Sequence, residues 1–203
     1  MVIGITGGVG SGKSSVMNIL MERYGARVII TDDIAKKLQE PGGESYELIV
    51  REFGEDILDT GTACTDPPID RKKLAQIVLS DRSRLELLNS LTHPQVRSRM
   101  EQMIQEAYEE DPEALIAAES ALFVEAGFRD ILDELWAVIT DKETRIERLR
   151  ISRGYSRKKA LSFMANQKSD EQYASEADFC IDNSGDIEAA AAQIAERLNI
   201  IIK

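Results

Sequence analysis

Residues 7–14 read GGVGSGKS, which satisfies the pattern G-x-x-x-x-G-K-S, and this stretch decides the fold. The residues before it, VIGIT at 2–6, form a short apolar and β-branched run that predicts a buried strand. Apolar residues then recur at helical spacing, for example at Val16 and Leu20, and Gly25 can end that helix. A strand, a glycine-rich loop and a helix in that order are typical of a phosphate-binding loop, and they disfavour a turn without a ligand.

The residue types in this loop are suited to binding the phosphates of a nucleoside triphosphate. Phosphate oxygens are met by converging backbone N–H groups, and glycine lets the backbone curl closely around them. The helix N-terminus adds its positive dipole end, Lys13 adds a mobile cation for the β- and γ-phosphates, and the Ser14 hydroxyl can bind Mg²⁺. We therefore expect ATP as cofactor, held by Gly8, Gly10, Ser11, Gly12, Lys13, Ser14 and Ser15, with Mg²⁺ on Ser14.

Four further short apolar runs predict the rest of a sheet. They lie at residues 28–30, 114–118, 135–139 and 179–181. A strand, a helix and a second strand joined by a crossover of this length favour a parallel sheet with helices packed on it. The expected fold class is therefore α/β, a three-layer α/β/α P-loop fold with a five-stranded parallel sheet.

The segments outside these strands predict two helical additions to a single domain. Residues 32–111 show helical periods without a strong strand, and we interpret them as a helical substrate-binding insertion. Thr140 and Glu143 form the spacing of a capping box, so a helix should begin where the fourth strand ends. Gly154 should interrupt it and Ser156 can cap the next helix. We expect a helical lid at about 142–175, with the core formed by 1–31, 112–141 and 176–203.

Composition excludes several classes of partner. The 203 residues carry 25 Lys and Arg against 36 Asp and Glu, a formal net charge of −11, which disfavours nucleic acid and anionic membrane surfaces. The sequence has no signal peptide and no apolar run long enough to span a membrane. Cys64 and Cys180 have no metal or redox spacing, so we interpret both as structural or incidental. We expect a cytoplasmic monomer that acts on a small molecule.

One segment of this acidic chain is locally basic. Residues 145–159 contain seven arginines and lysines, which favours a local anion such as the phosphates of a nucleotide. Arg148 and Arg153 are the strongest candidates to act on these phosphates in catalysis, because a planar guanidinium can grip two phosphate oxygens. The alternative is that these charges form a solvated helix face.

The remaining motifs separate kinases from other P-loop proteins. A GTPase would need N-K-x-D, and the nearest stretch, residues 166–169, reads NQKS. A small-molecule kinase needs a carboxylate near the acceptor hydroxyl, and Asp32 and Asp33 follow the second predicted strand, where open α/β sheets bind ligands. The alternative is that both are acids favoured by the dipole of the following helix.

The combined pattern resembles the dephospho-CoA kinase family over nearly the whole chain. The stretches that carry the resemblance are GITGGVGSGKSSV, VIITDDIAKKLQEPG, IDRKKLAQIV, THP, ALFVEAGF and QKSDEQYASEADFCIDNSGD, in that order. The resemblance implies transfer of the ATP γ-phosphoryl group to the ribose 3′-hydroxyl of dephospho-CoA, the last step of coenzyme A synthesis. It also implies a nucleotide core, a helical CoA-binding part and a lid.

The resemblance indicates which of the two aspartates acts on the acceptor hydroxyl, and it shows where this chain departs from the family pattern. In the family, the second aspartate of a D-A-D segment acts on the acceptor hydroxyl, and counting back from residues 40–42 places it at Asp32. The family's first aspartate is Ile30 here. Glu119 and Ala121 replace a family aspartate and proline, and Glu119 could hold Mg²⁺ through water.

Three other residues have both a functional and a structural interpretation. Arg71 could bind a substrate phosphate or begin a solvated helix. His93, before Pro94, could contact the CoA moiety, or it could be a structural residue or cap the helix that follows. Asn183 could lie near the adenine or cap the final helix. Two alternative functions stay open: another small-metabolite kinase of this fold, and a nucleotide-binding regulator without catalysis.

Overall fold

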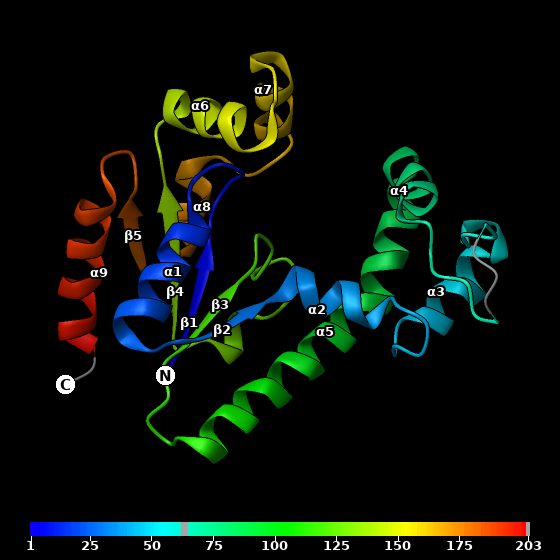
Figure 1. The fold of residues 1–203 in the computed structure, drawn as a ribbon, viewed down its shortest axis with the longest axis horizontal. Coiled ribbons are helices and arrows are strands. Elements are labelled where there is room, and N and C mark those ends of the chain that lie inside the picture. The colour runs from blue at the N-terminus through cyan, green and yellow to red at the C-terminus, as the bar shows by residue number, and fades with distance from the viewer. Residues whose placement is uncertain (62–64, 202–203) are drawn as a thin grey trace. The chain divides into compact units, whose positions relative to one another are not determined.

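A computed structural model describes residues 1–61 and 65–201, so Cys64 lies outside the described residues. The five strands are β1 (Val2–Thr6), β2 (Arg27–Ile30), β3 (Ile116–Glu119), β4 (Glu134–Ile139) and β5 (Phe179–Asp182). They form one parallel sheet in the order β2-β3-β1-β4-β5 (Figure 1). The predicted fold class is therefore confirmed, and each strand lies where an apolar run predicted it, with ends shifted by a few residues.

The helices follow the strands in the order that a parallel sheet requires. They are α1 (Lys13–Tyr24), α2 (Thr31–Leu38), α3 (Tyr46–Phe53), α4 (Arg71–Ser80), α5 (Arg82–Glu110), α6 (Lys142–Arg153), α7 (Arg157–Ala165), α8 (Asp170–Glu176) and α9 (Ile187–Ile201). The described residues also include short 3₁₀ helices at Glu55–Ile57 and Arg129–Ile131. No helix among the described residues is long and apolar enough to cross a membrane.

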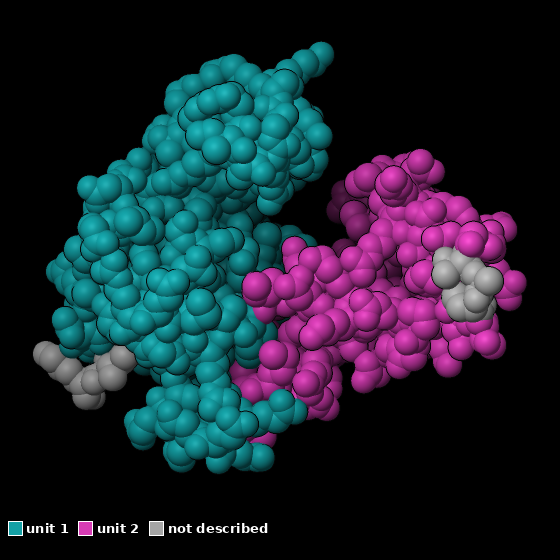
Figure 2. Space-filling model, in the orientation of Figure 1, with its two compact units in different colours: residues 1–29, 106–203 teal, residues 30–105 magenta. Residues whose placement is uncertain are grey.

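The chain divides into two compact units (Figure 2). Residues 1–29 and 106–203 form the first unit, which contains the phosphate-binding loop, and residues 30–105 form the second. The division of the chain into core, insertion and lid stays a prediction.

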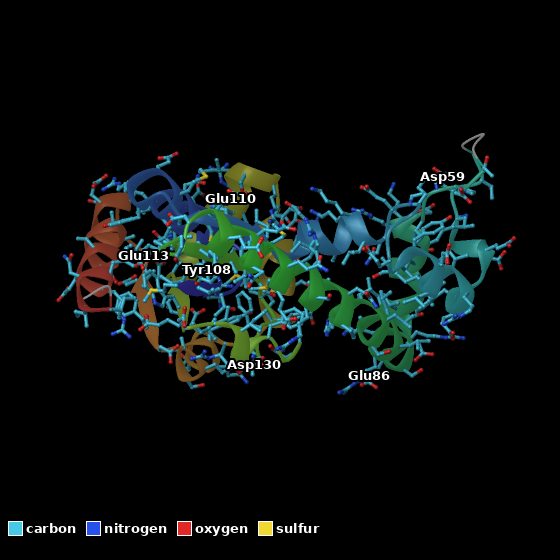
Figure 3. The ribbon with its side chains drawn as sticks, turned by 90° about the horizontal axis from the view of Figure 1, so that it is seen from below. Asp59, Glu86, Tyr108, Glu110, Glu113 and Asp130 are labelled. Atoms are coloured by element: carbon cyan, nitrogen blue, oxygen red, sulfur yellow. The ribbon has the colours of Figure 1, made fainter. Side chains whose placement is uncertain are left out.

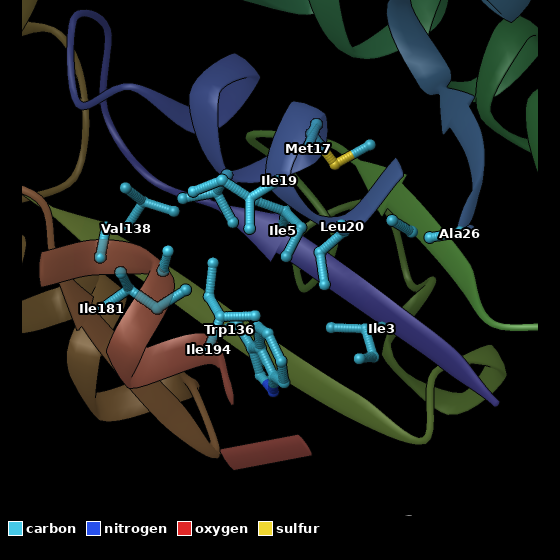
Figure 4. Packing of buried hydrophobic residues seen from close by; sticks show 14 of the residues in the cluster. Ile3, Ile5, Met17, Ile19, Leu20, Ala26, Trp136, Val138, Ile181 and Ile194 are labelled. Atoms are coloured by element: carbon cyan, nitrogen blue, oxygen red, sulfur yellow. The ribbon is translucent and has the colours of Figure 1, made fainter. Parts of the chain in front are cut away.

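The core of the first unit lies between the sheet and two helices. Ile3 and Ile5 of β1 and Trp136 and Val138 of β4 face α1 and α9, because alternate residues of a strand point to the same side (Figure 4). Trp136 also meets the Phe179 ring edge-on, with 5.4 Å between ring centroids. The helix α8 lies on the opposite side of the sheet from α1, which completes three layers (Figure 1).

The register of the sheet aligns the carboxyl ends of its strands. Ile5 of β1 pairs with Glu119, the last residue of β3, and Thr6 pairs with Ala137 of β4. Ile139 at the end of β4 pairs with Asp182 at the end of β5. The residues that follow β1, β3, β4 and β5 therefore emerge along one edge of the sheet.

At the amino ends of the strands, an ion pair joins the end of α5 to the start of β2. Glu110, labelled in Figure 3, pairs with Arg27 at 2.7 Å. Two residues earlier, burial raises the pKa of the Tyr108 phenol. The final turn of α5 is thus part of the first unit.

The second unit has its own small apolar core. Tyr46 and Ile49 of α3 pack with Leu74 and Val78 of α4 and with the buried Ile57. The Tyr46 hydroxyl donates to the Pro67 carbonyl at 2.6 Å, which ties the loop between these helices to α3.

Two expected helix starts are wrong. His93 and Pro94 lie inside the 29-residue α5, which begins at Arg82, so His93 does not cap a helix. Leu88 and Leu91 pack against the core of the second unit, and this packing keeps the turn before the proline helical. A proline marks a helix boundary only where tertiary contacts do not hold the preceding turn.

The start of α6 is one residue later than the predicted capping box. Asp141 is the N-cap, and its carboxylate accepts from the Thr144 N–H at 3.0 Å. Hydrogen bonds from Thr144, first from its side chain and then from its backbone N–H, lower the pKa of Asp141. Thr140 is fully buried and donates instead to a carbonyl of the phosphate-binding loop. The end of α6 at Gly154 and the Ser156 cap of α7 are confirmed.

Candidate active site

The phosphate-binding loop runs from β1 to α1 and needs glycine for its shape. Gly10 and Gly12 have φ angles of 77° and 91°, in the region that side chains disfavour. Gly12 is the N-cap of α1, so the unpaired N–H groups of that helix begin directly after the loop. Among the described residues, the N–H groups of Gly10 and Gly12 have no hydrogen-bond acceptor.

Lys13 reaches back over the loop. Its Nζ donates to the carbonyl of Gly7 at 3.0 Å and to that of Gly8 at 3.5 Å. The same Nζ lies 3.6 Å from Oε1 of Glu119, at the end of β3. The structure therefore brings together Lys13 and Glu119, two residues that the sequence predicted for one site. Lys13 is the first residue of α1, and the exposed Ser14 follows it as the second.

Asn183 supports the loop from the end of β5. It is 2% exposed, and its Nδ2 donates to the Ser11 carbonyl at 2.8 Å. The final helix is capped instead by Asp186, whose carboxylate accepts from the Ala189 N–H. The helix-capping alternative for Asn183 is thus wrong, because its side chain contacts the phosphate-binding loop instead.

Two residues from the α6 region share the same acceptor. Thr140 Oγ1 donates to the Ser11 carbonyl at 2.8 Å, and Arg148 Nη1 donates to it at 3.3 Å. Arg148 Nη2 donates to the Asn183 carbonyl at 2.8 Å. Arg148 therefore lies against the backbone of the loop, and Thr140 is a loop contact that sequence reasoning missed.

Arg145 is a second missed contact, although it belongs to the predicted basic segment. It is 4% exposed, and its Nε donates to the Val9 carbonyl at 3.0 Å. Its Nη1 pairs with Asp170 at 2.9 Å. Gln167 accepts from the Val9 N–H at 2.8 Å. Arginines at positions 145 and 148 lie one turn apart on a helix, and this spacing is the signal that could have found the pair.

Much of the remaining basic segment is neutralised locally. Arg150 pairs with Glu147 and Arg157 with Glu143, each at 2.6 Å, and the Lys159 ammonium lies over a tyrosine ring. Arg153 is exposed at the end of α6. Both interpretations of the segment thus have support, since some cations contact the loop and others form a charged surface.

The loop after β3 is held by a lysine from the segment before α8. Lys168 Nζ lies 2.6 Å from Glu176 and 2.7 Å from Glu125. Burial lowers the pKa of Lys168, but the hydrogen bonds to the two carboxylates outweigh it and raise that pKa overall. This lysine links the region after β3 to α8.

The second unit carries the other candidates. Asp32 and Asp33 are exposed in the first turn of α2, and Asp33 pairs with Lys36 at 2.6 Å. Arg71, the first residue of α4, donates from Nη2 to the Lys36 carbonyl at 3.3 Å. Burial lowers the pKa of His93. Asp32 lies in α2 and Arg71 contacts the backbone of the same helix, and both belong to the second unit.

The first unit offers donors and ligands that fit a nucleotide with its cation. The N–H groups of Gly10 and Gly12 and the Lys13 ammonium are donors for phosphate oxygens. The Ser11 Oγ is buried without a hydrogen-bond partner among the described residues, so it is a further polar atom within the loop. Magnesium is bound through few protein oxygens together with phosphates, and Ser14 and Glu119 supply that oxygen chemistry.

Comparison with known proteins connects this arrangement to one family. A family model described as dephospho-CoA kinase matches residues 1–189. The dephospho-CoA kinase of Geobacter sulfurreducens is 39% identical over 96% of this chain and 95% of its own. That of Carboxydothermus hydrogenoformans is 38% identical over 95% of this chain and 90% of its own.

Solved structures give the same fold. A protein from Thermus thermophilus matches with a TM-score of 0.81 and 27% identity, over 100% of this chain and 98% of its own. A shikimate kinase from Acinetobacter baumannii matches with a TM-score of 0.52 and 15% identity over 99% of this chain and 92% of its own, a likeness of fold alone.

Proposed function

The chain belongs to the dephospho-CoA kinase family, and from this premise we propose which of its residues perform the reaction. The protein transfers the γ-phosphate of ATP to the 3′-hydroxyl of the dephospho-CoA ribose, the final step of coenzyme A synthesis. The observation that carries the assignment is the match to this family over residues 1–189.

ATP binds along the loop from Gly8 to Ser15 in this proposal. The N–H groups of Gly10 and Gly12 and the hydroxyls of Ser11, Ser14 and Ser15 meet the β- and γ-phosphates. Lys13 Nζ now contacts two loop carbonyls, and it exchanges them for phosphate oxygens, which are stronger acceptors because they are charged. Asn183 lies beside the loop and close to the adenine end of the nucleotide.

Ser14 would hold the magnesium ion that accompanies ATP, and Glu119 would hold it through water. When bound, it neutralises charge on the β- and γ-phosphates. The support is the placement of Glu119 beside Lys13, at the edge of the sheet where the loop emerges.

Asp32 orients or deprotonates the 3′-hydroxyl. Its register in the family motif supports this role, and its carboxylate is exposed in the first turn of α2. Asp33 is already paired with Lys36, which leaves Asp32 as the better acceptor for a substrate hydroxyl. Positioned proton transfer of this kind is worth about 10²- to 10⁴-fold in rate.

The remaining predicted residues act either on the transferring phosphoryl group or on the acceptor. Arg148 and Arg153 stabilise charge on the transferring phosphoryl group, and Arg148 is already next to the phosphate-binding loop. In the second unit, Arg71 binds a phosphate of the acceptor and His93 contacts its CoA moiety. We also propose that the protein is a cytoplasmic monomer, which light scattering on the purified chain would check.

A substrate panel tests the reaction. Purified protein with MgATP should convert dephospho-CoA to coenzyme A, while shikimate, gluconate and nucleoside monophosphates should stay unphosphorylated. A Lys13→Met variant is the control for contaminating kinases. Phosphorylation of a nucleoside monophosphate without turnover of dephospho-CoA would favour another metabolite kinase, and ATP binding without any turnover would favour a regulator.

A further inference from the structure

Both backbone groups of Val9, at the tip of the phosphate-binding loop, are bound by residues from the α6 to α8 region. Its N–H donates to Gln167 Oε1 at 2.8 Å, and its carbonyl accepts from Arg145 Nε at 3.0 Å. Two residues further along, the Ser11 carbonyl accepts from Thr140, Arg148 and Asn183. The α6 region therefore holds two carbonyls of the loop that are separated by one residue.

Because peptide bonds are planar, the contacts to the Val9 and Ser11 carbonyls also determine where the N–H groups of the next residues point. In a trans peptide, the carbonyl of one residue and the N–H of the next point in opposite directions. All peptides of the loop are trans. With the Val9 and Ser11 carbonyls directed toward their donors on the α6 side, the N–H groups of Gly10 and Gly12 point the opposite way.

The peptide between Gly8 and Val9 has the reverse orientation. The Val9 N–H points to Gln167, and the Gly8 carbonyl accepts from the Ser11 N–H at 3.2 Å and from Lys13 at 3.5 Å. The Gly8–Val9 peptide is thus directed opposite to the Val9–Gly10 peptide that follows it.

We propose that Arg145 is a positioning residue for ATP: by holding the Val9 carbonyl, it aims the Gly10 N–H at the phosphates. The proposal rests on the assigned kinase function, and it gives Arg145 a role through the backbone, without contact to ATP. Arg148 contributes in the same way at Ser11, in addition to any contact that it makes with the transferring phosphate.

The surroundings of Arg145 fit this role. The side chain is buried, and its charge is balanced by Asp170 in the first turn of α8, where the helix dipole also favours a carboxylate. The guanidinium lies so close to the loop that a methyl group on Gly8 would be 2.2 Å from Nη2. Arg145 therefore packs on the loop backbone itself, and a general surface ion pair would need no such proximity.

The test compares Arg145→Met with Arg150→Met on the same helix. Methionine keeps the length and the apolar stem of arginine but donates no hydrogen bond. In the described part of the chain, Arg150 pairs with the exposed Glu147, so its loss should leave nucleotide binding unchanged. Three quantities would be measured on folded protein: the Kd of a non-hydrolysable ATP analogue without acceptor, KM for each substrate, and the Gly10 and Gly12 amide resonances.

The expected result is a selective loss at the nucleotide. Arg145→Met should weaken ATP-analogue binding by about 10- to 100-fold, shift both glycine amide resonances, and leave KM for dephospho-CoA within about twofold. Arg145→Lys keeps a hydrogen-bond donor but loses the planar guanidinium, so its affinity for the ATP analogue should lie between that of Arg145→Met and that of the native protein. A folded Arg145→Met protein with native ATP affinity and unmoved glycine resonances would overturn the proposal.

A second variant keeps the test decisive if Arg145→Met does not fold. Asp170→Asn preserves shape and removes only the charge that holds Arg145, so it should weaken analogue binding in the same direction by a smaller factor. Native affinity in that variant, with an unfolded Arg145→Met, would assign Arg145 a purely structural role. Binding of the ATP analogue is measured without acceptor, so the two proposals can fail separately. A native protein that binds nucleotide but does not phosphorylate dephospho-CoA would refute the assigned reaction and leave the role of Arg145 untouched.

Discussion

The Nζ atom of Lys13 lies 3.6 Å from Oε1 of Glu119. The lysine belongs to the loop after β1 and the glutamate ends the neighbouring strand β3. Both side chains are mostly buried, at 14% and 21% exposure, so the pair is poorly screened by solvent. A carboxylate thus stands beside the cation that we assign to the ATP phosphates, where Mg²⁺ is also proposed.

Replacing Glu119 by glutamine should raise the magnesium requirement. The amide keeps the shape but loses the charge that attracts the ion, so half-maximal activity should need about tenfold more Mg²⁺ at saturating ATP. Titrating activity against free Mg²⁺ measures this. Glu113→Gln, an exposed carboxylate before the same strand, is the matched control. If only KM for ATP changed, Glu119 would act through Lys13 and not through the metal.

Replacing Asp32 by asparagine should lower kcat by about 10²-fold or more, because the amide cannot accept a proton from the 3′-hydroxyl. Nucleotide affinity should stay native. Asp33→Asn is the matched control and should have little effect, since that carboxylate is engaged by Lys36 in an exposed pair. Steady-state kinetics with ATP and dephospho-CoA separates the two. Equal losses in both variants would refute the choice of Asp32.

Replacing Gly12 by alanine should abolish ATP binding. The residue has a φ of 91°, and a methyl group there would lie 2.1 Å from Asn183 Nδ2. Gly25→Ala is the matched control, because Gly25 has a φ of 67° but nothing within 4 Å of the added methyl. It should cost about 1 kcal/mol of stability from the left-handed backbone and leave ATP affinity native. Calorimetric Tm and ATP titration distinguish these outcomes, and a Gly12→Ala protein that bound ATP normally would contradict the prediction.

His93 should make stability depend on pH. Burial lowers its pKa from the ordinary value of 6.5, so the unfolded chain binds more protons than the folded chain below about that pH. The free energy of unfolding should therefore be highest above about pH 6.5 and fall as the pH drops through it toward the folded-state pKa.

Urea titrations followed by circular dichroism would measure this slope between about pH 7.5 and 5.5, where the carboxylates stay ionised. His93 is the one histidine of the chain, so His93→Gln should flatten the dependence. An unchanged slope in that variant would show that burial of His93 does not contribute.

The sequence by itself determined the elements that depend on local pattern. The glycines, Lys13 and the flanking strand and helix are consecutive, so their roles follow from backbone geometry and short-range periodicity. The apolar runs of the other strands are equally local, and they predicted the five-stranded sheet correctly. The family motif added the substrate, which the loop alone could not name.

The tertiary structure decided how the loop is held. Thr140, Gln167 and Asn183 contact it from 129, 158 and 172 residues away, and no local pattern encodes such contacts. The sequence assigned Thr140 to a helix cap and left Asn183 ambiguous, because short polar side chains fit both roles. In the sequence, Arg145 is one of seven cations in the basic segment. The structure distinguishes it, because its side chain is buried and donates to the Val9 carbonyl. Periodicity reports which face of a helix is apolar, whereas only packing reveals which polar group on that face meets a backbone carbonyl.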